Sequence, residues 1–133
     1  MIFRRRELPA DLAPADQAFR LVLEELEPAK AGLSDVLPGT RMPGRPLHDA
    51  LEEFATRLER AAALMPGWRR PELDDVWLRC QAGLQRAREL AGTLLREAPD
   101  VAGFEQLLGL VEELLDPLEP FADAEDRFRG LRA

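Results

Sequence analysis

The chain has 133 residues, 46% of them hydrophobic and 32% charged, and its formal net charge is −7. This length and mixture are typical of one globular domain, and they exclude a disordered chain. The acidic balance argues against nucleic-acid binding, which needs a basic surface, and no apolar run approaches the roughly 18 residues of a membrane span.

Composition and periodicity both predict helices. Leu, Ala, Glu and Arg dominate, whereas β-branched residues are few and tyrosine is absent, which favours helix over strand. Apolar residues recur at steps of three and four along four stretches. We therefore predict an all-α four-helix bundle that forms a single domain over residues 1–133, with residues 1–12 as an N-terminal extension. That extension holds the three arginines at positions 4–6, and the apolar stretch of a secretory signal does not follow them.

The first helix is predicted over residues 13–29. Pro14 suits its first turn, where a missing N–H costs nothing, and Pro28 should end or kink the helix. Its inward face is expected to carry Ala15, Ala18, Phe19, Val22, Leu26 and Ala29. A long loop over residues 31–46, with three glycines and three prolines, should separate it from the second helix.

The second helix is predicted over residues 46–64 and the third over residues 71–98. Met65, Pro66 and Gly67 should stop the second helix and turn the chain back. The inward faces are expected to carry Leu47, Leu51, Phe54, Leu58, Ala61 and Met65 in the second helix, and Leu73, Trp77, Cys80, Leu84, Ala87, Ala91, Leu94 and Ala98 in the third.

The fourth helix is predicted to begin near Asp100, a good N-cap residue, and to reach Phe128 with a kink at Pro117 and Pro120. The connections on either side of the third helix are short, which makes neighbouring helices antiparallel and up-down-up-down the default topology. The long first loop leaves a crossover open. Every charged residue between positions 100 and 126 is acidic, and we interpret these residues as a solvated face.

Metal-ligating patterns are poor in this sequence. A ferritin-like site needs several histidines, but His48 is the only one, and we expect it to form a solvated pair with Glu52 one turn away. The pairs Asp49-x-x-Glu52 and Glu72-x-x-Asp75 look superficially like those of all-α nucleotide pyrophosphohydrolases. An antiparallel hairpin would hold the two pairs too far apart to share an ion. We therefore expect no metal and no cofactor.

Nucleophilic catalysis also has little to work with. Cys80 falls on the inward face of the third helix, where we expect a buried and inert thiol. Ser34 is the only serine, and neither a nucleophile elbow nor a phosphate-binding glycine motif is present. These features favour a protein that is not an enzyme. A single cysteine also fits a reducing compartment, so we expect a cytoplasmic location.

The first candidate site is the loop over residues 38–46 that leads into the second helix. Free N–H groups of a glycine-containing loop, the positive end of a helix and two arginines, Arg41 and Arg45, could together bind an anion or an acidic partner. His48 follows in the first turn, and an antiparallel bundle would bring Arg96 to the same end. The alternative is a linker whose arginines only keep it solvated.

The second candidate site is the turn between the second and third helices, which contains Trp68, Arg69 and Arg70. An exposed tryptophan beside two arginines would make a good contact anchor for a partner. Alternatively, Trp68 folds back over the end of the bundle as a lid.

Two functions remain from the sequence. Leu107, Leu110 and Leu114 give the fourth helix a wider apolar arc than one core contact requires, which favours a non-catalytic module that binds a protein partner or forms a homodimer. The alternative is a regulatory protein or enzyme that binds a small anion or other ligand through Arg41 and Arg45.

Overall fold

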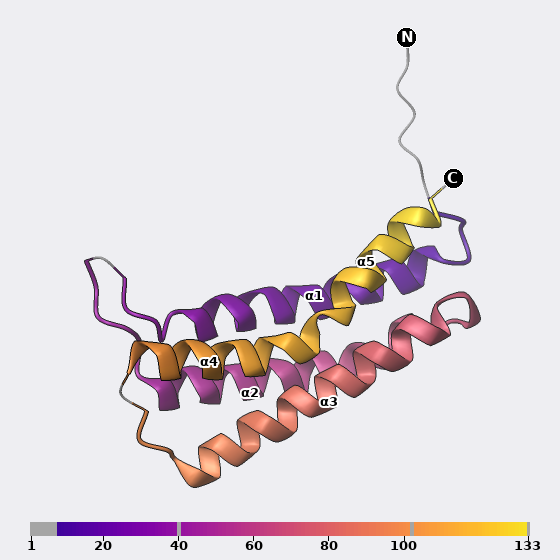
Figure 1. Ribbon diagram of the computed structural model, residues 1–133. Helices are drawn as coiled ribbons and strands as arrows, with labels where there is room; N and C mark the ends of the chain where they lie inside the picture. Colours follow the sequence, from indigo (N-terminus) through magenta and orange to yellow (C-terminus); the bar gives the residue numbers. More distant parts are fainter. Residues whose placement is uncertain (1–7, 40, 102, 133) are drawn as a thin grey trace.

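The computed structural model describes residues 8–39, 41–101 and 103–132, and these residues form helices and no strand (Figure 1). The long elements are α1 (Ala13–Ser34), α2 (Leu47–Leu64), α3 (Asp74–Glu97), α4 (Phe104–Leu115) and α5 (Pro120–Gly130). Because α4 and α5 are two halves of one bent rod, five helices occupy four positions. The predicted all-α four-helix bundle is confirmed. The arginines at positions 4–6 lie outside the described residues.

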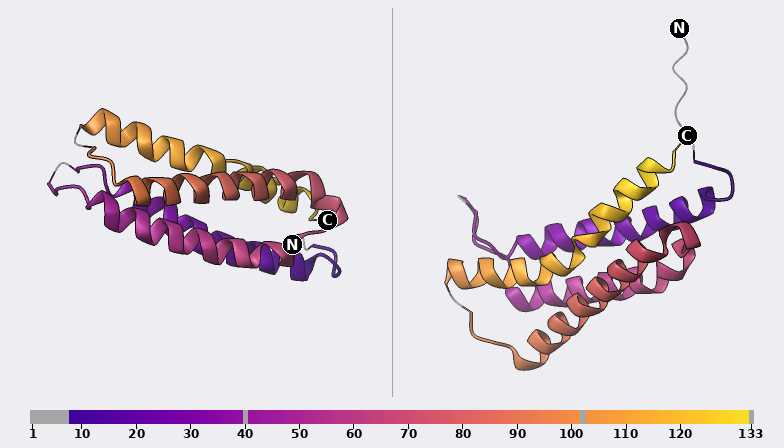
Figure 2. Two further views of the ribbon diagram at one scale, coloured as in Figure 1. Left: turned by 90° about the horizontal axis from the view of Figure 1, so that it is seen from below. Right: turned by 45° about the vertical axis from the view of Figure 1, so that its right-hand side comes forward.

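The helices alternate in direction along the bundle, so the topology is up-down-up-down (Figure 1). The long first loop returns the chain antiparallel to α1, and the crossover that the sequence left open does not occur. Seen from below, α1 and α2 form one pair, and α3 lies beside α4 and α5 in the other (Figure 2). None of the helices in the described ranges combines the length and apolar composition of a membrane span.

α1 is longer than the sequence predicted. It continues through Pro28 to Ser34, so the expected end at residue 29 is wrong. Ala29 and Leu33 are both buried beyond the proline, and burial of apolar side chains offsets the cost of about 3 kcal/mol for a proline inside a helix. Pro28 itself faces solvent, where water can hydrate the carbonyl group that lost its partner.

The connection between α3 and α4 also differs from the prediction. Asp100 does not cap α4, which begins at Phe104 with Gly103 in the N-cap position, so the linker is not the very short one expected. Ala98 ends α3 in the left-handed conformation, with φ 46°, and its N–H donates to the Leu94 carbonyl at 2.9 Å. The residue before Pro99 cannot comfortably stay helical, so α3 ends there and the chain needs more residues to start α4.

The predicted bend at Pro117 and Pro120 is confirmed. α4 gives way to a 3₁₀ turn, η3 (Asp116–Leu118), and Pro120 then starts α5. The bend lies against α3, because a Cβ atom added to Gly83 would stand 1.8 Å from the Pro117 carbonyl oxygen. The absence of a side chain at Gly83 thus lets the two backbones touch where the rod changes direction.

Candidate functional site

Arg45, the centre of the predicted anion site, is already paired. Its guanidinium forms a hydrogen-bonded ion pair with Glu53 of α2, and its backbone N–H donates to the Asp35 carbonyl at 2.7 Å. The hydrogen bond from Arg45 holds the pKa of the Glu53 carboxyl below its usual range. Arg45 therefore fastens the loop of residues 35–46 to the bundle, and its charge is neutralised by the protein itself.

The other residues of the predicted anion site do not converge on Arg45. Arg41 is exposed on the loop, His48 pairs with Glu52 at 2.8 Å, and Arg96 donates to the Thr93 hydroxyl at 3.2 Å on its own helix. No hydrogen bond or ion pair within the described residues joins Arg41, His48 or Arg96 to Arg45. The His48–Glu52 pair forms as expected, and both side chains are solvated.

Trp68 cannot act as an exposed anchor, because it is fully buried. It lies in a 3₁₀ turn, η1 (Met65–Trp68), and folds back against Phe19 of α1 with ring centroids 4.9 Å apart. The prediction of a lid over the bundle end is therefore confirmed. Arg69 stacks over the Trp77 ring at 4.3 Å and pairs with Asp74.

Arg70, the third residue of that turn, also has ion-pair partners within the protein. Its guanidinium lies 3.6 Å from an oxygen of Asp11 and 3.8 Å from one of Glu72. All three residues of the predicted interaction turn thus have partners within the fold.

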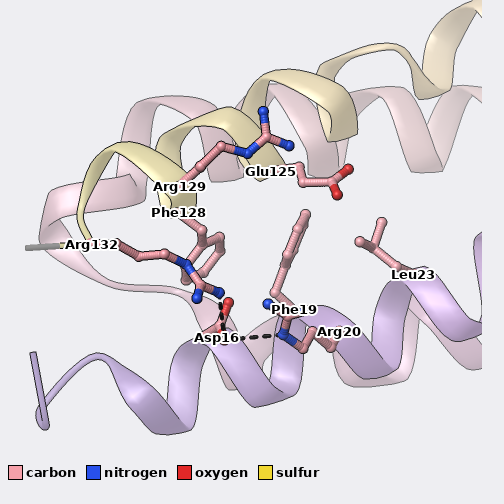
Figure 3. Close-up of a pocket in the computed structure, with 8 residues that line it drawn as sticks. All are labelled: Asp16, Phe19, Arg20, Leu23, Glu125, Phe128, Arg129 and Arg132. Carbon is pink, nitrogen blue, oxygen red and sulfur yellow. Dashed lines mark hydrogen bonds and ion pairs between the residues drawn. The ribbon is translucent and has the colours of Figure 1, made fainter. Parts of the chain in front are cut away.

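The sequence did not predict a run of adjoining hollows along α1, which we call the α1–α5 groove. It lies between residues 16–30 of α1 and residues 115–132 of the bent rod opposite. Two hollows of about 350 and 250 Å³ have residues of both elements in their walls, and a third of about 460 Å³ adjoins them on the surface of α1. All three have Leu23 in their walls. Figure 3 shows the first hollow, with Phe19 and Leu23 rising from α1 toward Glu125 and Arg129 on α5.

The groove exists because the helices pair unevenly. α1 packs closely along α2, and α3 packs against η3 and α5, whereas the backbones of α1 and α5 stay further apart. Side chains bridge that seam: the rings of Phe19 and Phe128 stack with centroids 4.9 Å apart. Leu23 is only half-buried in the same hollow as these rings, and Leu115 is half-buried in the next one. An apolar floor is thus left partly uncovered between two helices.

Every cation that lines the groove has a carboxylate partner. The carboxylate of Asp16 forms ion pairs with Arg20 at 3.1 Å and with Arg132 at 3.7 Å, and dashed lines mark both in Figure 3. Lys30 pairs with Glu27 at 3.0 Å, and Arg129 pairs with Asp126 at 3.1 Å.

Three carboxylates of the groove lack such partners. Glu24, Glu119 and Glu125 line its walls and are exposed, and no ion pair to them occurs within the described part of the chain. Arg20 and Arg132 share the single carboxylate of Asp16, so these three unpaired carboxylates outnumber the one arginine charge left over, and the charge left unneutralised is negative. This arrangement can attract positive charge above an apolar floor.

A metal-ligating cluster and a thiol are both absent from the groove within the described residues. Among the described residues, no three His, Cys, Asp or Glu side chains are grouped so that they could hold a metal ion. Cys80, the only thiol, is buried in α3 away from the groove, and burial raises its pKa to about 12.

Comparison with protein families, curated proteins and solved structures finds no match for this chain.

Proposed function

We propose that this protein is a non-catalytic interaction module that binds a polypeptide in the α1–α5 groove. One observation carries the proposal: three adjoining hollows share Leu23, a half-buried apolar side chain between two helices. Apolar grooves between helices are a common docking place for peptide segments. We place this binding in the cytoplasm, in keeping with a single cysteine that has no disulfide partner.

The α4 half of the rod, which reaches the groove only at Leu115, also leaves apolar side chains uncovered. Among its twelve residues only Val111 and Leu114 are buried, and Phe104 is 52% exposed. A bundle with no partner would gain by covering such side chains more fully. The bound polypeptide could belong to another protein or to a second copy of this chain.

The experiment uses a matched pair of variants on α1. Leu23 lies in the groove, whereas Leu21, 43% exposed, lines none of its three hollows. A displayed library of random peptides of roughly 16 residues, about the length of four helical turns, is selected on the purified protein. Selected peptides are then titrated by calorimetry into the wild type, Leu23→Gln and Leu21→Gln.

We expect Leu23→Gln to weaken binding by about tenfold or more, because the central apolar contact becomes polar, while Leu21→Gln leaves the affinity unchanged. Light scattering on the protein alone covers the case of a second copy: a dimer that Leu23→Gln dissociates supports the same function. A library that yields no binder from a monomeric protein, or binders indifferent to Leu23→Gln, overturns the proposal.

A further inference from the structure

The α1–α5 groove also indicates which kind of polypeptide it takes. We infer that the occupant is a basic amphipathic helix with an apolar stripe on one face and Lys or Arg beside it. This inference rests on the proposed function, because it names the chemistry of the segment that binds in the same groove.

The shape of the groove suits a helix. On α1 it extends over residues 16–30, which at about 1.5 Å per residue is roughly 21 Å, or four helical turns. Its walls are themselves helices, α1 on one side and η3 with α5 on the other. A helix placed between them would set apolar residues at steps of three and four against Leu23 and Leu115, the half-buried side chains of the floor.

The charged side chains of the groove indicate the charge of the helix that binds there. The three arginines and the lysine of the groove already pair with Asp16, Glu27 and Asp126, so an acidic occupant would have to compete with those carboxylates. A basic occupant meets Glu24, Glu119 and Glu125, which have no ion-pair partner within the described residues. Complementary charge of this kind mainly selects the partner and speeds its approach, while the apolar stripe supplies most of the affinity.

The same charges argue against a second copy as the occupant. The chain carries a net charge of −7, and its most apolar exposed helix, α4, has only acidic charged residues. Bringing α4 of another copy into the groove would place Glu105, Glu112 and Glu113 near carboxylates that are already unpaired. A basic segment of a different protein avoids that repulsion.

The test uses three synthetic helical peptides with one common apolar stripe and a polar face of Lys and Arg, of Gln, or of Glu. Each is titrated by fluorescence anisotropy into the wild type and into a groove variant, Glu24→Gln/Glu119→Gln/Glu125→Gln. The matched control is Glu105→Gln/Glu112→Gln/Glu113→Gln, which removes the same charge from exposed positions of α4. Circular dichroism confirms that both variants keep the helical fold.

We expect the basic peptide to bind the wild type about tenfold or more tightly than the acidic one, since three exposed pairs each contribute a few-fold. The groove variant should lose most of that preference and the α4 variant should keep it, and high salt should reduce it. Equal binding of all three peptides, all sensitive to Leu23→Gln, would overturn the basic partner but leave the proposed function standing. Failure of the basic peptide to bind also overturns the inference, whereas the displayed library tests the groove independently.

Discussion

Met65 organises the turn between α2 and α3 by accepting two indole N–H groups. Trp77 donates to its carbonyl oxygen at 2.8 Å, and Trp68 donates to its sulfur at 3.3 Å. A buried indole N–H without an acceptor would be costly, so these two bonds allow both rings to stay inside. The two tryptophans therefore close this end of the bundle, and the guanidinium of Arg69 stacks over the outer side of the Trp77 ring.

Cys80 supplies the first residue-scale prediction. Its side chain is fully buried, and burial raises the pKa of the thiol to about 12. At pH near 8 its thiolate fraction should be more than a thousandfold smaller than that of an ordinary cysteine, whose pKa is about 8.5. A chromogenic disulfide reagent should label the native protein very slowly and the urea-unfolded protein at once. Rapid labelling with an unchanged circular dichroism spectrum would contradict this placement.

At the scale of elements, the sequence predicted faces better than ends. The inward positions of the first three helices came from apolar spacing, and sixteen of the twenty are buried, because burial is what selects that spacing. Ala18, Leu47 and Leu94 are only partly buried, and the prediction for Ala98 is wrong, because it lies exposed at the end of α3. The residues at which a helix begins and ends depend on smaller free energies, such as those of capping and of single prolines. Pro28 did not stop α1 because Leu33 is buried beyond it, and Asp100 did not cap α4 because the chain first had to pass the left-handed Ala98 and Pro99.

The candidate sites were harder to predict for a related reason. Arg45 looked free in the sequence, yet the path of its loop brings it to Glu53, and no spacing rule encodes that path. The α1–α5 groove is built from segments about a hundred positions apart in the sequence. One signal was present: Leu23 widens the apolar face of α1 beyond the stripe that Val22 and Leu26 form.

Two glycines supply a prediction at the element scale. A Cβ atom at Gly83 would stand 1.8 Å from the Pro117 carbonyl oxygen, whereas one at Gly109 of α4 would meet nothing within 4 Å. Gly83→Ala should therefore force α3 and the bent rod apart and cost about 1–3 kcal/mol in the free energy of unfolding. Gly109→Ala should stabilise the protein by about 0.5–1 kcal/mol, because alanine favours an exposed helix interior.

Urea unfolding followed by circular dichroism measures both changes on one scale. If Gly83→Ala lowers the free energy of unfolding and Gly109→Ala raises it, the loss at Gly83 comes from the backbone contact and not from helix propensity. If Gly83→Ala proved as stable as the wild type, the close approach at Pro117 would be refuted.

For the whole molecule, ion pairs between elements add to the apolar core. Arg45 joins the first loop to Glu53 of α2, and Arg127 of α5 forms an ion pair with Asp75 of α3. In both pairs the hydrogen bond from the arginine is the main cause that holds the pKa of the carboxyl below its usual range. The first pair joins a loop to the helix that follows it, and the second joins two helices whose paired residues are 52 positions apart in the sequence.

The sign of the pH dependence follows from those pKa values. Because both carboxyls have a lower pKa in the folded state than in the unfolded chain, the unfolded state binds more protons between the two values. Their contribution to stability is therefore complete above the ordinary pKa of about 4 and is lost as the pH falls through the folded values. Glu53 is partly exposed and Asp75 is largely exposed, so we expect the effect to be small and to weaken with salt.

The double variant Glu53→Gln/Asp75→Asn should consequently unfold at a lower urea concentration than the wild type at neutral pH. The gap between the two urea midpoints should close as the pH falls through the folded pKa values of the two carboxyls. Glu112→Gln/Glu113→Gln removes the same charge from exposed positions of α4 that form no ion pair with the described residues, and it should show no such gap. A gap that persists unchanged into acid would mean that packing around the substituted side chains, rather than charge, accounts for the loss. In that case the two arginine pairs would not be what holds the first loop and α5 to the bundle.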